Sequence, residues 1–201
     1  MTITPELLRA ILAMDSYNRG YNYGVDLGGG ISSEVATTTD VIGGYKIILN
    51  STEAFAVDAA KNIGFYGIAY QNLTTGEVVI SYRGTDGQPN WLDYQSGYLV
   101  GAGDPDEPQS RLAFEFYRKV ADLINGGTPA DPYAANISVT GDSLGGGLAG
   151  LVGAVYHKEG SLFNNMAYKG AAENLSDHIL VEPSTLINRY SSDLYQIING
   201  T

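Results

Sequence analysis

Apolar residues recur at helical spacing in three segments of the chain. Residues 5–17 carry leucine, isoleucine and methionine three and four positions apart, and Thr4 before Pro5 is a candidate helix cap. The same spacing over residues 110–125, just before two glycines, predicts a second amphipathic helix. Residues 52–62 predict a third and shorter helix.

Segments rich in β-branched and aromatic residues lie between these helices. The letters FYGIAYQ, a turn at NLTTG and EVVISYRG predict a hairpin over residues 65–84. Within it, residues 78–82 are nearly continuous in β-branched residues, as in a strand covered on both faces. Residues 136–141 (NISVTG) predict another strand, which leads directly into a helix of small residues. This order predicts a right-handed crossover in an α/β fold, with a mixed, mostly parallel sheet flanked by helices.

Length and composition fit one globular domain over residues 1–201. Hydrophobic residues make up 44% and charged residues 16% of the chain, which argues against disorder. Glycine and threonine dominate residues 18–44, which predict a long surface segment or an irregular hairpin. The first 17 residues predict a helix and no signal peptide, and no stretch is apolar enough for stable membrane insertion.

Charge and cysteine count exclude several classes of chemistry. The formal net charge of −11 would repel nucleic acid phosphates and anionic bilayers, so neither is an expected partner. Because the chain has no cysteine, it forms no disulfide, no thiolate nucleophile and no cysteine-rich metal site. No cofactor is expected. No clear calcium-loop spacing is found, although a structural calcium ion is not excluded.

The most informative letters are G-D-S-L-G at residues 141–145. They match the G-x-S-x-G pattern, in which a serine lies on a sharp turn between a strand and a helix. Glycine at 141 and 145 supplies the room that such a turn needs, and Ser143 would stand at a helix N-terminus. There the amide of Leu144 favours a developing oxyanion. The simpler alternative is that Ser143 only caps the helix.

A second group of residues follows the predicted strand 78–82. Acyl transfer needs another oxyanion donor from a loop after a neighbouring strand, and Thr85 is placed to give its backbone amide. Arg83 and Asp93 in the same segment are also candidates for a structural ion pair. The two roles are compatible.

The ordered motifs V-V-I-S-Y-R-G-T, N-W-L-D and S-V-T-G-D-S-L-G-G-G resemble the class 3 lipase family of α/β-hydrolases, including bacterial lipases with repeat tails. The resemblance covers roughly residues 64–174. It implies a lipase or esterase acting in lipid degradation, with Ser143 as nucleophile and Thr85 and Leu144 as oxyanion hole. The family usually has histidine where this chain has Asp142. Secretion is likewise only implied by the resemblance.

Activation of the serine needs a general base held by a carboxylate, in the usual chain order serine, acid, histidine. Of the two histidines, His157 would lie about 20 Å away, at the far end of the helix that Ser143 begins. The candidate base is therefore His178, with Asp193 as the acid that the resemblance implies after a predicted strand at 186–190.

No histidine follows Asp193, so we expect a chain that is incomplete at its C-terminus and lacks its base. A permuted triad of Ser143, His178 and Asp193 is a second explanation, and loss of the chemistry is a third. The predicted function is a serine carboxylic-ester hydrolase with an acyl-enzyme on Ser143, acting on a small-molecule ester or acylglycerol. The alternative is a catalytically impaired or non-catalytic α/β-hydrolase module without a competent base.

Overall fold

In the computed structural model, the described residues are 4–20, 41–55, 60–61, 63–85 and 107–173. Within them, six strands form one sheet in the order β1-β2-β3-β4-β5-β6. The strands are β1 (Val41–Ile42), β2 (Tyr45–Asn50), β3 (Gly67–Asn72), β4 (Val78–Tyr82), β5 (Ile137–Asp142) and β6 (Gly160–Phe163). The helices are α1 (Pro5–Asp15), the 3-10 turn η1 (Ser16–Asn18), α2 (Ser51–Ala54), α5 (Pro108–Ile124) and α6 (Leu144–Tyr156).

The sheet is mixed, and four of its six strands run in the same direction. Antiparallel pairs join β1 to β2, β2 to β3 and β3 to β4, whereas β4, β5 and β6 are parallel to one another. Strands β2, β4, β5 and β6 therefore point one way, and β1 and β3 point the other. The predicted α/β class with a mixed, mostly parallel sheet is confirmed at this level.

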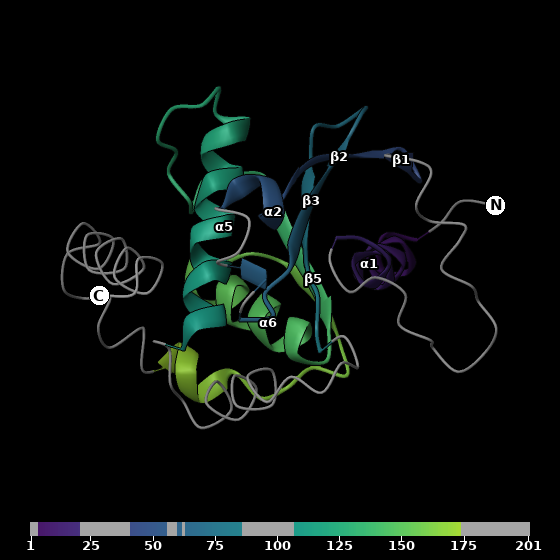
Figure 1. The fold of residues 1–201 in the computed structure, drawn as a ribbon. Helices are drawn as coiled ribbons and strands as arrows, with labels where there is room; N and C mark the ends of the chain where they lie inside the picture. Colours follow the sequence, from purple (N-terminus) through teal and green to yellow (C-terminus); the bar gives the residue numbers. More distant parts are fainter. Residues whose placement is uncertain (1–3, 21–40, 56–59, 62, 86–106, 174–201) are drawn as a thin grey trace.

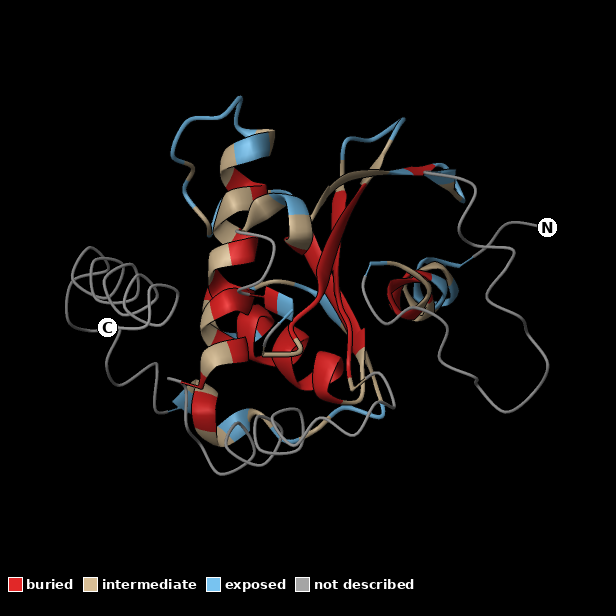
Figure 2. Cartoon of the chain, viewed as in Figure 1, coloured by how far each residue is buried: buried red, intermediate tan, exposed pale blue. Residues whose placement is uncertain are grey.

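Helices cover both faces of the sheet (Figure 1). Helices α2, α5 and α6 lie on one face, and α1 lies on the other. Side chains of β4 alternate between these layers, because successive residues of a strand point to opposite faces. Val78, Ile80 and Tyr82 pack with α5 and α6, while Val79 packs with Leu12 of α1. Buried residues accordingly run through the sheet and along α6 (Figure 2).

The crossover from β4 to β5 places the ends of both strands at one edge of the sheet. Helix α5 connects the two strands, and their parallel register pairs Val78 with Ile137 and Tyr82 with Gly141. The residues after Tyr82 and those after Asp142 consequently leave the sheet side by side. This arrangement brings together the two segments that carry the predicted site.

The helix boundaries follow from local chemistry. The Thr4 hydroxyl accepts a hydrogen bond from Leu7 N–H at 3.2 Å, and Pro5 takes the first helical position, as predicted. The Glu107 carboxylate caps α5 by accepting from Ser110 N–H at 3.0 Å. Among the helices described, none combines the length and the apolar character that crossing a bilayer requires.

The predicted hairpin over residues 65–84 is present as β3 and β4, and the predicted helix at 110–125 as α5. The helix expected at 52–62 is described only as α2 and at residues 60–61. Strands β2 and β6 were not predicted. The strand expected at 186–190 and most of the segment 18–44 lie outside the described residues.

Candidate functional site

Ser143 is the single residue between a buried strand and a buried helix. Strand β5 ends at Asp142 and α6 begins at Leu144, so the chain reverses at a single residue. The backbone of Ser143 has φ 56° and ψ −124°, a conformation that residues with a Cβ atom adopt only under strain. Its side chain forms no capping hydrogen bond with the helix. Ser143 thus occupies the N-cap position of α6 without using its hydroxyl to cap the helix.

Two glycines allow the turn because a side chain at either position would strike backbone. A Cβ on Gly141 would lie 2.8 Å from Gly146 N and closer still to Gly145. A Cβ on Gly145 would meet the carbonyl of Tyr82 and would lie 2.7 Å from Arg83 C. Helix α6 thus presses directly against the end of β4, as predicted from the small residues at its start.

The segment after β4 reaches Ser143. A Cβ placed on Gly84 would lie 2.6 Å from the carbonyl oxygen of Asp142 and 3.1 Å from Ser143 Cβ. Thr85, the next residue, is half-buried. The structure therefore brings Gly84, the residue before Thr85, against the serine turn, and the oxyanion role of Thr85 stays a prediction.

Arg83 anchors this segment from within the core. It is 1% exposed, its guanidinium lies 4.9 Å from the centre of the Tyr66 ring, and Nη1 donates to Arg19 O at 3.4 Å. Burial raises the pKa of the Tyr66 hydroxyl to about 12. Asp93, the expected ion-pair partner of Arg83, lies outside the described residues.

Asp142, which stands where the resembling family has histidine, is held on both sides. Its Oδ2 accepts from the Tyr17 hydroxyl at 3.2 Å, and its Oδ1 accepts from Asn164 Nδ2 at 3.0 Å. Tyr17 lies in η1 and is 4% exposed. Burial, followed by the charge of Asp142, raises the pKa of the Tyr17 hydroxyl well above its usual value. The hydroxyl therefore stays protonated and can donate.

The chain after β5 is also tied to the serine turn through main-chain hydrogen bonds. Ser143 N–H donates to Phe163 O at 2.9 Å, and Ser143 O accepts from Met166 N–H at 3.1 Å. The same carbonyl accepts from Gly147 N–H at 3.1 Å within α6. Strand β6 and the residues that follow it thus support the strained turn.

Of the three residues considered as base or acid, the structure describes His157 alone. His157 follows the 13 residues of α6 and is exposed, with its ring 5.9 Å from that of Tyr133. At 1.5 Å per residue the helix separates it from Ser143 by about 20 Å, as expected. His178 and Asp193 lie outside the described residues, so their roles stay predictions. Among the described residues, the His, Asp and Glu side chains form no cluster of three or more that could hold a metal ion.

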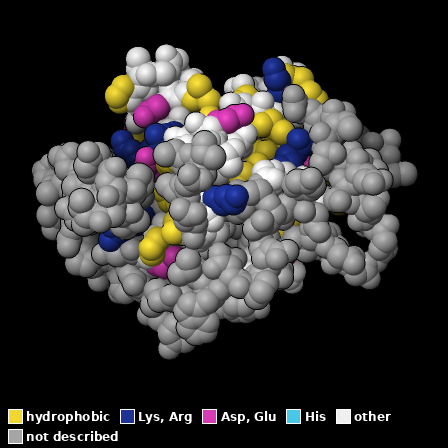
Figure 3. All heavy atoms as spheres, viewed as in Figure 1, with side chains coloured by type: hydrophobic (Ala, Val, Ile, Leu, Met, Phe, Trp, Pro, Cys, Tyr) yellow, Lys and Arg dark blue, Asp and Glu magenta, His cyan; other side chains and the backbone are white. Residues whose placement is uncertain are grey.

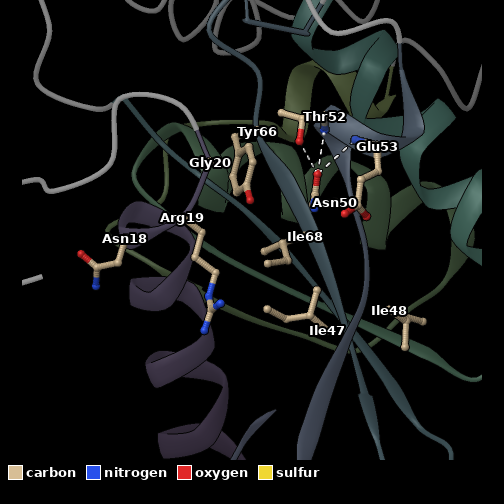
Figure 4. A pocket seen from close by; sticks show the side chains of 10 residues that line it. All are labelled: Asn18, Arg19, Gly20, Ile47, Ile48, Asn50, Thr52, Glu53, Tyr66 and Ile68. Carbon is tan, nitrogen blue, oxygen red and sulfur yellow. Dashed lines mark hydrogen bonds between the residues drawn. The ribbon is translucent and has the colours of Figure 1, made fainter. Parts of the chain in front are cut away.

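A cavity of about 520 Å³ opens between η1 and strands β2 and β3 (Figure 4). It lies at the same edge of the sheet as Ser143, because β2 ends at Asn50 where β3 begins. The Asn50 side chain points to the start of α2 and accepts from the N–H groups of Thr52 and Glu53. The lining is Asn18, Arg19, Gly20, Ile47, Ile48, Asn50, Thr52, Glu53, Tyr66 and Ile68. Strand β4 separates β3, which lines the cavity through Ile68, from β5, which ends at the serine turn.

The described surface carries charges of both signs despite the net charge of −11. On the face in Figure 3, Lys and Arg side chains lie interspersed with Asp and Glu. Ion pairs join some of the described charges, such as Arg9 with Glu77 at 3.6 Å. On that face the described side chains form no block of a single charge.

Tyr17 is the site residue that the sequence does not indicate. It is 125 residues from Asp142 in the chain, and it lies in a helical segment where an aromatic residue signals only packing. No local pattern could have linked it to the serine turn.

No protein-family model matches the chain, and comparison with curated proteins finds no match. The likeness to class 3 lipases therefore remains a resemblance of motifs. What the fold and the site define is an α/β protein with a strained, strand-to-helix serine.

Proposed function

We propose that the protein is a serine carboxylic-ester hydrolase, of the lipase or esterase kind, with an α/β-hydrolase fold. The observation that carries the proposal is the conformation of Ser143 on a one-residue turn between β5 and α6. This conformation supports a nucleophile elbow, a strand-to-helix turn that presents a serine hydroxyl at a helix N-terminus. Strain at a residue of this type is typical of functional sites.

In the proposed reaction the Ser143 oxygen attacks the ester carbonyl carbon and its proton passes to a base. The carbonyl oxygen gains the negative charge of a tetrahedral intermediate, which the amides of Leu144 and Thr85 would bind. Leu144 opens α6, and the first amides of a helix have no acceptor within it. Collapse of the intermediate breaks the ester C–O bond and releases the alcohol with the proton. Water then repeats the sequence on the acyl-enzyme.

The general base within the chain would be His178, held by Asp193. Substrates would be small esters or acylglycerols, and the reaction needs no cofactor. The approach of Gly84 to Ser143 supports the oxyanion role of Thr85, because Thr85 is the next residue in the chain.

A fluorophosphonate probe tests the proposal, because it reacts with an activated serine and not with ordinary ones. We expect the probe to label Ser143, identified by peptide mass spectrometry, and Ser143→Ala to lose both labelling and hydrolysis of p-nitrophenyl butyrate. Ser161→Ala is the matched control and should leave labelling unchanged, because this strand serine accepts from the Thr140 hydroxyl through its carbonyl, which alanine keeps. Absence of labelling on the wild-type chain would remove the proposal.

Histidine variants then separate the candidate bases. His178→Ala should lower the labelling rate by roughly 10³-fold or more if it is the base. His157→Ala should change it less than twofold, because α6 holds that ring far from Ser143.

The second candidate function is a non-catalytic module that keeps the turn as scaffold. Among the described residues the histidine is His157, which α6 holds about 20 Å from Ser143. Under this hypothesis Ser143 would react with the probe no faster than Ser161.

A further inference from the structure

The Tyr17 hydroxyl joins the two segments that meet at Ser143. Its oxygen accepts a hydrogen bond from Gly84 N–H at 3.1 Å, so it holds the segment after β4. Its proton is shared between two oxygens of Asp142, the main-chain carbonyl and Oδ2, each at 3.2 Å. One buried oxygen thus bridges the ends of two parallel strands.

The two bridged residues lie within two positions of the proposed oxyanion donors. Gly84 precedes Thr85, and Asp142 lies two residues before Leu144. Oxyanion donors act through their preorganisation, so the spacing of the two amides matters more than the presence of either one. A Cβ on Gly84 would collide with the Tyr17 hydroxyl, which confirms that this oxygen fills the gap between the two segments.

The surroundings of Tyr17 hold the hydroxyl in place. The residue is 4% exposed and belongs to η1, whose position is set by the packing of α1 on the sheet. Asp142 is fixed from its other side by Asn164. Burial disfavours loss of the phenol proton, so the hydroxyl keeps its ability to donate to Asp142.

We infer that Tyr17 is a positioning residue for the oxyanion site, and that its hydroxyl sets the distance between the amides of Thr85 and Leu144. The inference rests on the proposed hydrolase function. Removal of the hydroxyl should widen this gap, and a displacement of the order of 1 Å can cost about 100-fold in rate.

Tyr17→Phe tests the inference, with Tyr70→Phe as the matched control. Phenylalanine keeps the ring that fills the buried position and removes one hydroxyl. Tyr70 is also buried on the α1 side of the sheet, but its hydroxyl donates to Asp15 Oδ2 at 2.7 Å and not to Asp142. We expect Tyr17→Phe to lower kcat by about 10- to 100-fold with KM changed less than about twofold. Tyr70→Phe should leave kcat within about twofold of the wild type.

Inhibition by a boronic acid separates positioning from general stability. A boronate forms a tetrahedral adduct on the serine and uses the oxyanion hole, as the transition state does. Its Ki should rise in Tyr17→Phe by about the factor by which kcat falls, and should stay unchanged in Tyr70→Phe, although both variants lose a buried hydrogen bond. Equal kcat and Ki values for Tyr17→Phe and wild type would overturn the inference while leaving the hydrolase proposal intact. A wild-type chain that neither hydrolyses esters nor labels at Ser143 would overturn both.

Discussion

At the scale of single residues, the energetics of Ser143 differ from those of an ordinary turn serine. A residue with a Cβ atom at φ 56° and ψ −124° stores about 1–3 kcal/mol of backbone strain. The neighbouring glycines do not relieve it; they only make room for it. Glycine would carry no such strain, and strained residues of this kind are found mostly at functional sites.

This strain predicts opposite effects of one substitution on stability and activity. Ser143→Gly should be more stable than Ser143→Ala by about 1 kcal/mol, because relief of strain exceeds the extra entropy of glycine in the unfolded chain. Neither variant should react with a fluorophosphonate. Urea unfolding of the two variants measures the difference, and a less stable glycine variant would show that position 143 is unstrained.

Gly84 makes the second prediction at this scale. In Gly84→Ala the new methyl group would lie 2.6 Å from the Asp142 carbonyl oxygen, so the segment 83–85 must shift away from Ser143. We expect the labelling rate of Ser143 to fall by at least about tenfold. Because the Tyr17 hydroxyl is another obstacle, Tyr17→Phe in the same chain should make the substitution less harmful than the sum of the two changes. Strictly additive rate losses would contradict this close contact.

At the scale of elements, the sequence predicts those strands and helices whose environment is visible locally. Strand β4 is covered on both faces and therefore shows a continuous run of β-branched residues, and α5 shows an amphipathic repeat. Strand β6 has only four residues and exists because it pairs in parallel with β5, about 20 positions earlier in the chain. Strand β2 is half-buried and bulged between Ile47 and Leu49, so its alternation is weak.

The candidate site likewise contains one residue with a local sequence signal and one without. A five-letter pattern identifies Ser143 because its turn needs small neighbours next to it in the chain. The role of Tyr17 depends on a contact across 125 residues, and no periodicity in either segment encodes such a contact.

Helix α6 provides a prediction for a whole element, because its glycines differ in what faces them. Gly145→Ala should cost about 3 kcal/mol of stability or prevent folding, since the methyl group would enter the backbone of β4. Gly153→Ala, in the same helix, has its nearest neighbours at 3.2 Å and gains helix propensity, so it should stay within about 1 kcal/mol of wild type. Chemical denaturation of both variants decides the matter. Equal stabilities would show that α6 does not press on β4.

At the scale of the whole molecule, the core combines phenols with aliphatic side chains. Fifteen tyrosines are present, and several of them lie at 0–4% exposure on both faces of the sheet. Burial is the first cause of a raised pKa for Tyr17, Tyr66, Tyr70, Tyr82 and Tyr117. The molecule therefore depends on keeping these hydroxyls neutral, and this dependence sets its limit at high pH.

The sign of the effect follows from proton binding. In the unfolded chain a tyrosine titrates near pH 10, whereas in the folded protein the pKa of Tyr66 is about 12. Between these values the folded state binds more protons, so the stability present below pH 10 is lost as the pH rises to 12. For Tyr66 alone the loss is about 3 kcal/mol over that interval.

We therefore expect the urea midpoint to fall steeply between pH 10 and pH 11, with phenolate absorbance at 295 nm appearing together with unfolding. Tyr66→Phe is the control that isolates one group, because it keeps the ring under the Arg83 guanidinium and removes one titrating proton. The free energy of unfolding of this variant should fall less steeply with pH, and the difference in slope should correspond to about one bound proton. A folded protein that titrates all its tyrosines reversibly near pH 10 would mean that these hydroxyls are not buried, and the two-layered core around the sheet would be wrong.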